Sequence, residues 1–316
     1  MRPAGAGITL ASMHRRRFLE LSAAGATVPC AGVVVGKEPA AALAFGVVAD
    51  VQYADADPEG ERHYRESAPK LKAAVADLAH ERLAFTLNLG DLIDRDFRSF
   101  ATVLPLFTPL GHPARHLTGN HDYMVGKEDK ERVTPTLGIP AGHSAFSSSG
   151  VRFVMLDTND VSTYKHAPGT ARHREAVAML EALATAGRPN AQPWNGGVSQ
   201  AQLAWLEQEL AAADTAGAPV ILCSHHPLLP ADSGNVAWNA GAVVEGVARH
   251  RCVRACFAGH HHDGGQAVAH GVPFITFKSI VHEPGVTAYA VVRLFPDRLV
   301  IEGRGREPSR TLPLRG

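Results

Sequence analysis

Short apolar runs alternate with longer stretches of helical periodicity from about residue 44 to the end of the chain. Each run ends in polar or charged residues, which is typical of buried strands that stop at the surface. We expect strands at 44–49, 85–89, 115–118, 152–156, 220–223, 255–258 and 274–277, followed by a hairpin-like pair around Pro296 and Asp297.

Between these runs, apolar residues recur with helical spacing at 64–83, 173–185, 199–213 and 241–250. Ser199 is a plausible N-cap of the third helix, and Gln202 completes a capping-box pattern. Strands that are apolar on both faces need helices on both sides, so the layout predicts a layered α/β sandwich.

The first 44 residues differ from the rest and are typical of an export signal. Arg15, Arg16 and Arg17 precede a weakly apolar Ala/Gly-rich run, as in a twin-arginine signal. A small-residue pattern at 42–44 adjoins the first expected strand. We expect a leader at 1–44, one catalytic domain at 45–316 and a periplasmic location. The alternatives are a basic amphipathic helix and, if the signal is unused, a cytoplasmic protein.

The overall composition excludes some partners. Formal net charge is zero and the sequence pI is near 7.3, so nothing indicates binding to nucleic acid or to an anionic membrane. No later segment has the roughly 18 apolar residues that span a bilayer. The 17 histidines favour a metal centre, whereas the four cysteines form no metal or disulfide pattern and are expected to be buried apolar residues.

Residues that bind metals follow most of the expected strands. In open α/β sheets the carboxyl ends of strands line one crevice, where distant residues converge. Each such residue alone has a structural explanation: an acid caps a helix, an asparagine turns the chain and a histidine packs in the core. Together they predict a site built from Asp50, Gln52, Asp91, Asn120, His121, His225, His260 and His262.

Five motifs then give a family resemblance. VADVQ at 48–52, GDLID at 90–94, GNHD at 119–122, SHHP at 224–227 and GHHH at 259–262 resemble those of calcineurin-like metallophosphoesterases. The resemblance covers residues 45–303. It implies a four-layer α/β/β/α sandwich, in which two central mixed sheets are flanked by helices.

The resemblance also implies two divalent metal ions. Asp50, Gln52, Asp91 and His262 would hold one ion, while Asp91, Asn120, His225 and His260 would hold the other, so that Asp91 bridges them. His121 would contact the phosphoryl group or protonate the leaving oxygen. Asp122 would either orient His121 or lie in a loop as a hydrated carboxylate.

Two departures from the general pattern narrow the choice of metal. Gln52 occupies a position that is usually histidine, and an amide oxygen favours Mn²⁺ or Mg²⁺ over Zn²⁺. Asp94 occupies the position of the tyrosine ligand of purple acid phosphatases, which argues against ferric iron. We expect Mn²⁺, with Mg²⁺, Fe²⁺ and Zn²⁺ as the alternatives.

Longer segments resemble the manganese-dependent ADP-ribose/CDP-alcohol diphosphatases, notably WNGGVSQAQLAWL at 194–206 and HRCVRACFAGHHHDGG at 250–265. This resemblance implies hydrolysis of the phosphoanhydride in a nucleoside diphosphate-linked substrate, by attack of metal-bound hydroxide on phosphorus. Expected substrate contacts are base stacking on Tyr53 and Trp194, a distal phosphate on Arg65, and backbone donors at Asn195, Gly196 and Gly197. A solvated helix face for Arg65 and a plain turn at 195–197 are the structural alternatives.

Two other functions are compatible with part of this pattern. A phosphodiesterase or phosphomonoesterase acting on another ester would use the same metal motifs. A phosphoesterase scaffold that has lost its ligands can instead serve as a binding module. No ligand position is missing here and His121 is present, which favours an enzyme.

Overall fold

The computed structural model describes residues 41–139 and 141–315, so the expected twin-arginine segment lies outside the described residues. The first strand, β1, begins at Leu43. Leu43 and Ala44 already pair with Leu294 and Arg293.

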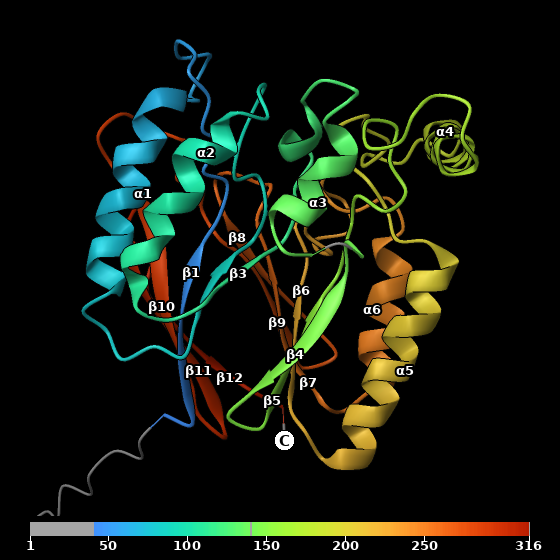
Figure 1. The fold of residues 1–316 in the computed structure, drawn as a ribbon. Coiled ribbons are helices and arrows are strands. Elements are labelled where there is room, and N and C mark those ends of the chain that lie inside the picture. Colours follow the sequence, from blue (N-terminus) through green and yellow to red (C-terminus); the bar gives the residue numbers. More distant parts are fainter. Residues whose placement is uncertain (1–40, 140, 316) are drawn as a thin grey trace, which may run out of the picture. The chain divides into compact units, whose positions relative to one another are not determined.

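Twelve strands form two six-stranded mixed sheets that lie between helices (Figure 1). The first sheet has the order β12-β11-β10-β1-β2-β3 and the second β4-β5-β6-β7-β9-β8. The strands are β1 (Leu43–Val48), β2 (Thr86–Asn88), β3 (Ala114–His116), β4 (Ser144–Ser148), β5 (Val151–Met155), β6 (Val220–Cys223), β7 (Val253–Ala258), β8 (Gly265–Ala269), β9 (Val272–Thr276), β10 (Ala288–Leu294), β11 (Arg298–Gly305) and β12 (Arg310–Pro313).

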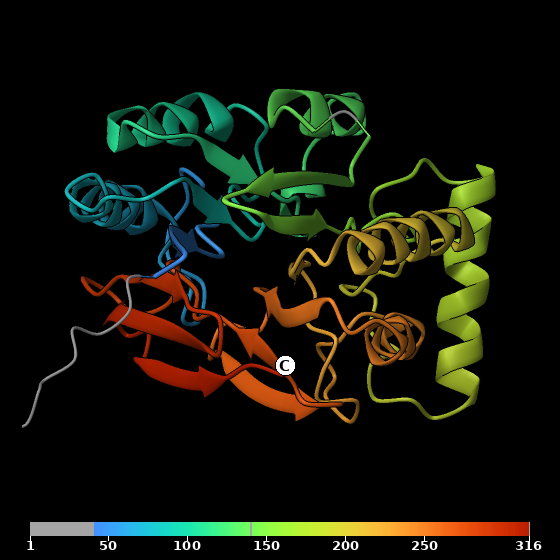
Figure 2. The same ribbon diagram turned by 90° about the horizontal axis from the view of Figure 1, so that it is seen from below.

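Helices cover the outer face of each sheet, which confirms the expected four layers (Figure 2). In Figure 1, α1 and α2 lie beside the first sheet, and α5 and α6 beside the second. The helices are α1 (Tyr64–Leu78), α2 (Ser99–Val103), α3 (Val133–Thr136), α4 (Ala171–Thr185), α5 (Gln200–Ala216) and α6 (Ala240–Arg249), with short 3₁₀ turns at Leu104–Leu110, His121–Tyr123 and Lys130–Arg132.

Three apolar clusters hold the layers together. One lies between the two sheets and contains Phe45, Phe153 and Phe257, whose rings are all buried. A second joins the first sheet to α1, and a third joins the second sheet to α5 and α6. Strands buried on both faces therefore explain the continuous apolar runs of the sequence.

Several elements differ from the sequence prediction. All seven expected strands and all four expected helices are present, although α1 ends at Leu78 and not at 83. The elements β4, β8, β12, α2 and α3 were not expected from the sequence, because they are short or carry small polar residues. Cys223, Cys252 and Cys256 are buried free thiols, as expected. No helix among the described residues is long and apolar enough to cross a membrane.

Parallel pairing brings the site together. β1, β2 and β3 are parallel to one another, as are β5, β6, β7 and β9. The loops that follow β1, β2, β3, β6 and β7 carry the expected metal-binding residues. The fold thus gathers these loops at the carboxyl ends of the strands, where α/β folds commonly place their sites.

Candidate metal centre

The backbone is left-handed at four of the expected ligands. The φ angles are 51° at Asp50, 44° at Gln52, 53° at Asp91 and 66° at His260. Residues with a β-carbon rarely adopt this conformation, and each such residue costs on the order of 1 kcal/mol or more. The strained backbone conformation at these positions turns the ligand side chains into the crevice.

Two glycines let the carboxylates approach the neighbouring loops. A β-carbon at Gly119 would lie 2.1 Å from Oδ1 of Asp91, and one at Gly259 would lie 2.6 Å from Oδ2 of Asp50. Both distances are shorter than non-bonded contact allows. The glycines of the GNHD and GHHH motifs are therefore required by the packing of the two aspartates.

Asp91 lies between two groups of ligand-type side chains. Its Oδ2 is 3.0 Å from Nε2 of Gln52 and 3.3 Å from Nε2 of His225. On the Gln52 side, Nε2 of His262 lies 3.0 Å from the amide nitrogen of Gln52 and 3.9 Å from Oδ1 of Asp50. This places Asp91 next to both groups that the resemblance implies.

The second group is centred on the amide oxygen of Asn120. That oxygen lies 3.1 Å from Nε2 of His225 and 3.0 Å from Nδ1 of His260. Ligand atoms of Asp50, Asp91 and His225 all lie within 4.8 Å of one another, close enough to surround a cation. The structure thus brings together all seven residues expected to bind metal.

Hydrogen bonds outside the centre orient two of the histidines. His225 directs Nδ1 to the carbonyl of Leu89 at 2.9 Å, and His260 directs Nε2 to Oδ1 of Asn195 at 3.0 Å. The other ring nitrogen of each histidine therefore faces the centre. Partners of this kind fix the orientation and tautomer of histidine ligands.

The charges of the centre fit a divalent cation. Asp50 and Asp91 are completely buried, and burial raises the pKa of the Asp50 carboxyl to about 7. Burial opposes protonation of His225, but the adjacent Asp91 raises the pKa of His225 to about 9. No Lys or Arg of the described residues pairs with Asp50 or Asp91. Protons therefore balance the charge of these two carboxylates. Carboxylate, amide and imidazole donors suit Mn²⁺, Mg²⁺, Fe²⁺ and Zn²⁺.

His121 is oriented by Asp94 and not by Asp122, which corrects the expectation for Asp122. Nδ1 of His121 lies 2.9 Å from Oδ2 of Asp94. Burial would lower the pKa of His121, but Asp91 and Asp94 outweigh it and raise this pKa. His121 also lines the pocket over the centre.

Asp122 shapes the backbone around Asp91. It is fully buried and accepts hydrogen bonds from the backbone N–H groups of Asp91, Leu92, Ile93 and Gly119 at 2.9–3.1 Å. The hydrated loop carboxylate considered as its alternative is therefore wrong as well. Burial and the neighbouring Asp91 raise the pKa of the Asp122 carboxyl to about 7, whereas the backbone donors favour its charged form. Four donors in one place suit the two oxygens of a carboxylate, which explains why an aspartate occupies this position.

The centre forms the floor of a pocket of about 660 Å³. Trp194 lines the pocket and has 47% of its surface exposed, so its indole is accessible to a ligand there. The lining residues are Gln52, Arg62, Asn120, His121, Met124, Tyr164, Pro193, Trp194, Asn235, His260, His261, His262 and Asp263.

Five of the expected substrate contacts lie elsewhere. Tyr53 packs on the cluster beneath α1, and Arg65 is an exposed residue bound to Asp55 and Asp57; neither lines the pocket. Asn195 is buried and holds His260. Gly196 and Gly197 are buried. A β-carbon would lie 2.3 Å from the carbonyl oxygen of Thr158 at Gly196 and 2.9 Å from Oδ1 of Asn239 at Gly197, so close packing requires glycine at both positions.

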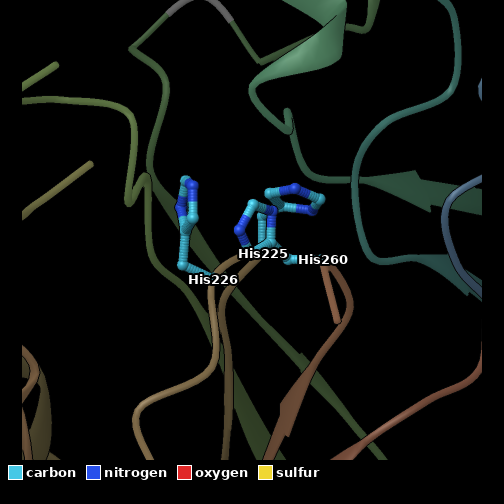
Figure 3. A group of neighbouring side chains, drawn as sticks. All are labelled: His225, His226 and His260. Carbon is cyan, nitrogen blue, oxygen red and sulfur yellow. The ribbon is translucent and has the colours of Figure 1, made fainter. Parts of the chain in front are cut away.

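Several residues at the site were not expected from the sequence, among them Arg62, Tyr164 and His226. His226 stands beside His225 and His260, and its ring centre is 4.4 Å from that of His260 (Figure 3). Its ring nitrogens already face Thr158 and the carbonyl of Trp194. Burial lowers the pKa of His226 to about 3, so it is a neutral support of the Trp194 loop. Its place in the SHHP motif was the available signal.

Known proteins with the same features were found by sequence and by structure. Residues 43–264 match the model of the calcineurin-like phosphoesterase family. The manganese-dependent ADP-ribose/CDP-alcohol diphosphatase of Oryza sativa subsp. japonica is 33% identical over 86% of this chain and 94% of its own. The protein of that name from Mus musculus is 31% identical over 85% and 93%.

A solved structure has the same fold, and its sequence identity to this chain is similar to that of the two relatives. The crystal structure of a dimetal phosphatase from Danio rerio superposes with a TM-score of 0.76 and 29% identity, covering 87% of this chain and 100% of its own. Together with the family match over residues 43–264, these likenesses agree with the geometry of the centre. The chain belongs to the calcineurin-like phosphoesterase family.

Proposed function

We propose that this protein is a dinuclear metal-dependent hydrolase that cleaves the phosphoanhydride of nucleoside diphosphate-linked compounds such as ADP-ribose and CDP-alcohols. The observation that carries the proposal is the position of Asp91 between two ligand groups at the floor of the pocket. The names of the Oryza and Mus relatives point to the same substrate class.

We assign the two metal sites as the family resemblance implies. One is formed by Asp50, Gln52, Asp91 and His262, and the other by Asp91, Asn120, His225 and His260. When bound, two divalent ions polarise the phosphoryl oxygens and lower the pKa of the water that attacks phosphorus. We assign Mn²⁺ because two of the donors are amides and because the relatives are named manganese-dependent.

The remaining site residues position the substrate and move a proton. Asp94 holds Nδ1 of His121, so Nε2 is left to donate a proton to the oxygen that leaves phosphorus. Trp194 offers an exposed indole to the base. The bridging P–O bond breaks, the water oxygen bonds to phosphorus, and a nucleoside monophosphate is one of the two products.

The proposal is tested by substrate and metal preference. Chelator-treated protein would be assayed with ADP-ribose, CDP-choline, bis(p-nitrophenyl) phosphate and p-nitrophenyl phosphate, after addition of Mn²⁺, Mg²⁺ or Zn²⁺. We expect Mn²⁺-dependent release of AMP from ADP-ribose and CMP from CDP-choline, in preference to both nitrophenyl esters. Cleavage of the nitrophenyl esters alone would reject the diphosphatase proposal and favour another phosphoesterase of the family.

We also propose that the N-terminal segment exports the folded protein to the periplasm. Support comes from the order of Arg15, Arg16 and Arg17 before an Ala/Gly-rich run, which is typical of a twin-arginine signal. Such export carries folded proteins, so the metal could be loaded before translocation. Fractionation of cells that express the full chain tests this. The protein should be periplasmic, and the double substitution Arg16→Lys and Arg17→Lys should leave it in the cytoplasm; identical fractions for both would reject the proposal.

A further inference from the structure

Arg62 is the one arginine among the lining residues of the pocket. Its Nε donates a hydrogen bond to Oε1 of Gln52 at 3.1 Å, and no other side chain of the described residues accepts from its guanidinium. An arginine has five N–H donors in a planar fork. Most of the donors of Arg62 are therefore available to a ligand in the pocket.

The charge of Arg62 is also not neutralised by the loop that carries it. Apart from the metal ligand Asp50, that loop holds four acids, and each lies against a basic residue other than Arg62: Asp55 and Asp57 against Arg65, Glu59 against Arg95, and Glu61 against His282. Within the part of the chain that the structure describes, no carboxylate pairs with Arg62. A half-buried guanidinium without a counter-ion favours an anion in the pocket.

The backbone of Arg62 is fixed before any ligand binds. Arg62 and Glu59 exchange two backbone hydrogen bonds of 3.0 Å across a turn in which Gly60 has a φ of 57°. The next residue, His63, donates its backbone N–H to the carbonyl of Val281. The backbone N–H of Val281 in turn donates to the backbone carbonyl of Asp50, a residue of the metal centre. The backbone of Arg62 is therefore held in register with the centre, and little backbone conformational entropy is lost when its side chain binds a ligand.

Metal binding would make Arg62 still more available. The amide of Gln52 now directs Nε2 to Asp91 and His262 and Oε1 to Arg62. As a metal ligand, Gln52 must present its oxygen to the centre, which turns its NH₂ group toward Arg62. Two donors then face each other, so Nε of Arg62 needs a new acceptor.

We propose that Arg62 binds the phosphoryl group of a diphosphate substrate that is not attacked, and so selects diphosphates over esters with a single phosphate. This inference rests on the proposed function and adds a residue that sets its specificity. The first phosphate lies on the metal centre, and the second supplies the acceptor and the negative charge that Arg62 lacks. Arg65, the arginine expected from the sequence to do this, is bound to Asp55 and Asp57 outside the pocket.

The test compares a diphosphate with a monophosphate diester in variants of Arg62. In Arg62→Met, kcat/KM for ADP-ribose should fall roughly 10- to 100-fold, the range for lost hydrogen bonds to a charged group, chiefly through a higher KM. For bis(p-nitrophenyl) phosphate it should change less than about threefold, and bound Mn²⁺ should match the wild type. Arg62→Lys should restore part of the ADP-ribose activity, because it keeps the charge but loses the planar fork.

Arg98→Met is the matched control, because Arg98 is exposed and pairs with Asp96 away from the pocket. It should leave both substrates unchanged. Equal losses on both substrates with loss of Mn²⁺ would show that Arg62 acts only through Gln52 and would overturn the inference, as would unchanged ADP-ribose kinetics. If Arg62→Met does not fold, the same comparison in Arg62→Lys decides. If the wild type cleaves only the nitrophenyl ester, the proposed function fails first, so the two failures are distinguishable.

Discussion

Single residues at the metal centre are held in conformations that the chain would not adopt alone. Asp50, Gln52 and Asp91 have positive φ angles. The backbone N–H groups of Asp50 and Gln52 donate to the backbone carbonyls of Gly90 and Asp91, respectively. The backbone N–H of Asp91 donates to the carboxylate of Asp122. These hydrogen bonds offset the local strain and leave each side chain directed at the centre. Side-chain hydrogen bonds orient two histidines in a similar way: Asp94 holds the ring of His121, and Asn195 holds the ring of His260.

The substitution Asp94→Asn tests this positioning at the scale of one residue. An amide cannot accept from Nδ1 of His121 with the strength of a carboxylate, so the ring loses its fixed orientation. We expect kcat for ADP-ribose to fall roughly 10- to 100-fold, the range for loss of such a supporting group, while KM and Mn²⁺ content stay near wild type.

Asp96→Asn is the matched control, because Asp96 lies two residues away and pairs only with Arg98. Steady-state kinetics and metal analysis of both variants decide the matter. A wild-type kcat in Asp94→Asn would remove His121 and Asp94 from the proposed mechanism.

At the scale of elements, α5 links the second sheet to the loop that carries Trp194. Oγ of Ser199 accepts the N–H of Gln202 at 3.2 Å and caps the helix, as expected. The reciprocal half of the capping box is absent: the amide of Gln202 binds the backbone of Asp157 beyond β5, and Asp160 accepts the N–H of Ser199. The first turn of α5 is thereby tied to the end of β5.

Ser199→Ala should destabilise the protein by about 1 kcal/mol, because it leaves a buried helix N–H without its acceptor. Thr215→Ala in the last turn of the same helix is the control, since its exposed hydroxyl bonds only to the carbonyl of Ala211. Urea unfolding of both variants, with m held in common, measures the difference. Equal midpoints for Ser199→Ala and the wild type would show that the cap contributes nothing to stability.

At the scale of the whole molecule, the site is the place where both sheets end. Loops after β1, β2 and β3 of the first sheet meet loops after β6 and β7 of the second. The completely buried carboxylates of Asp50, Asp91 and Asp122 lie at this junction. A divalent cation would replace the protons that balance these carboxylates and would bind only to the folded arrangement of loops, so metal binding should stabilise the fold as a unit.

Chelator-treated protein should therefore melt at a lower temperature than protein with excess Mn²⁺. A ligand at 100 times its Kd stabilises the native state by about 2.7 kcal/mol, which corresponds to a Tm increase of about 5 °C for a chain of this size. Differential scanning calorimetry across a Mn²⁺ series measures the shift.

Two variants at the centre sharpen the measurement of metal-dependent stability. Asp91→Ala removes the residue shared by both ligand groups, so it should abolish both the Mn²⁺-dependent shift and activity. His121→Ala should keep the shift and lose turnover. A full Mn²⁺ response in Asp91→Ala would contradict the central position of Asp91.

The sequence by itself determined the layered α/β fold and the convergence of the seven residues from Asp50 to His262. Both follow from local rules: buried strands appear as apolar runs, and parallel strands place their ends at one edge. Only the tertiary structure decided the contacts between loops. Which carboxylate reaches His121, and whether Arg62 or Arg65 enters the pocket, depends on pairings between distant segments. Such pairings have no period or spacing in the sequence, because geometry between packed loops sets them.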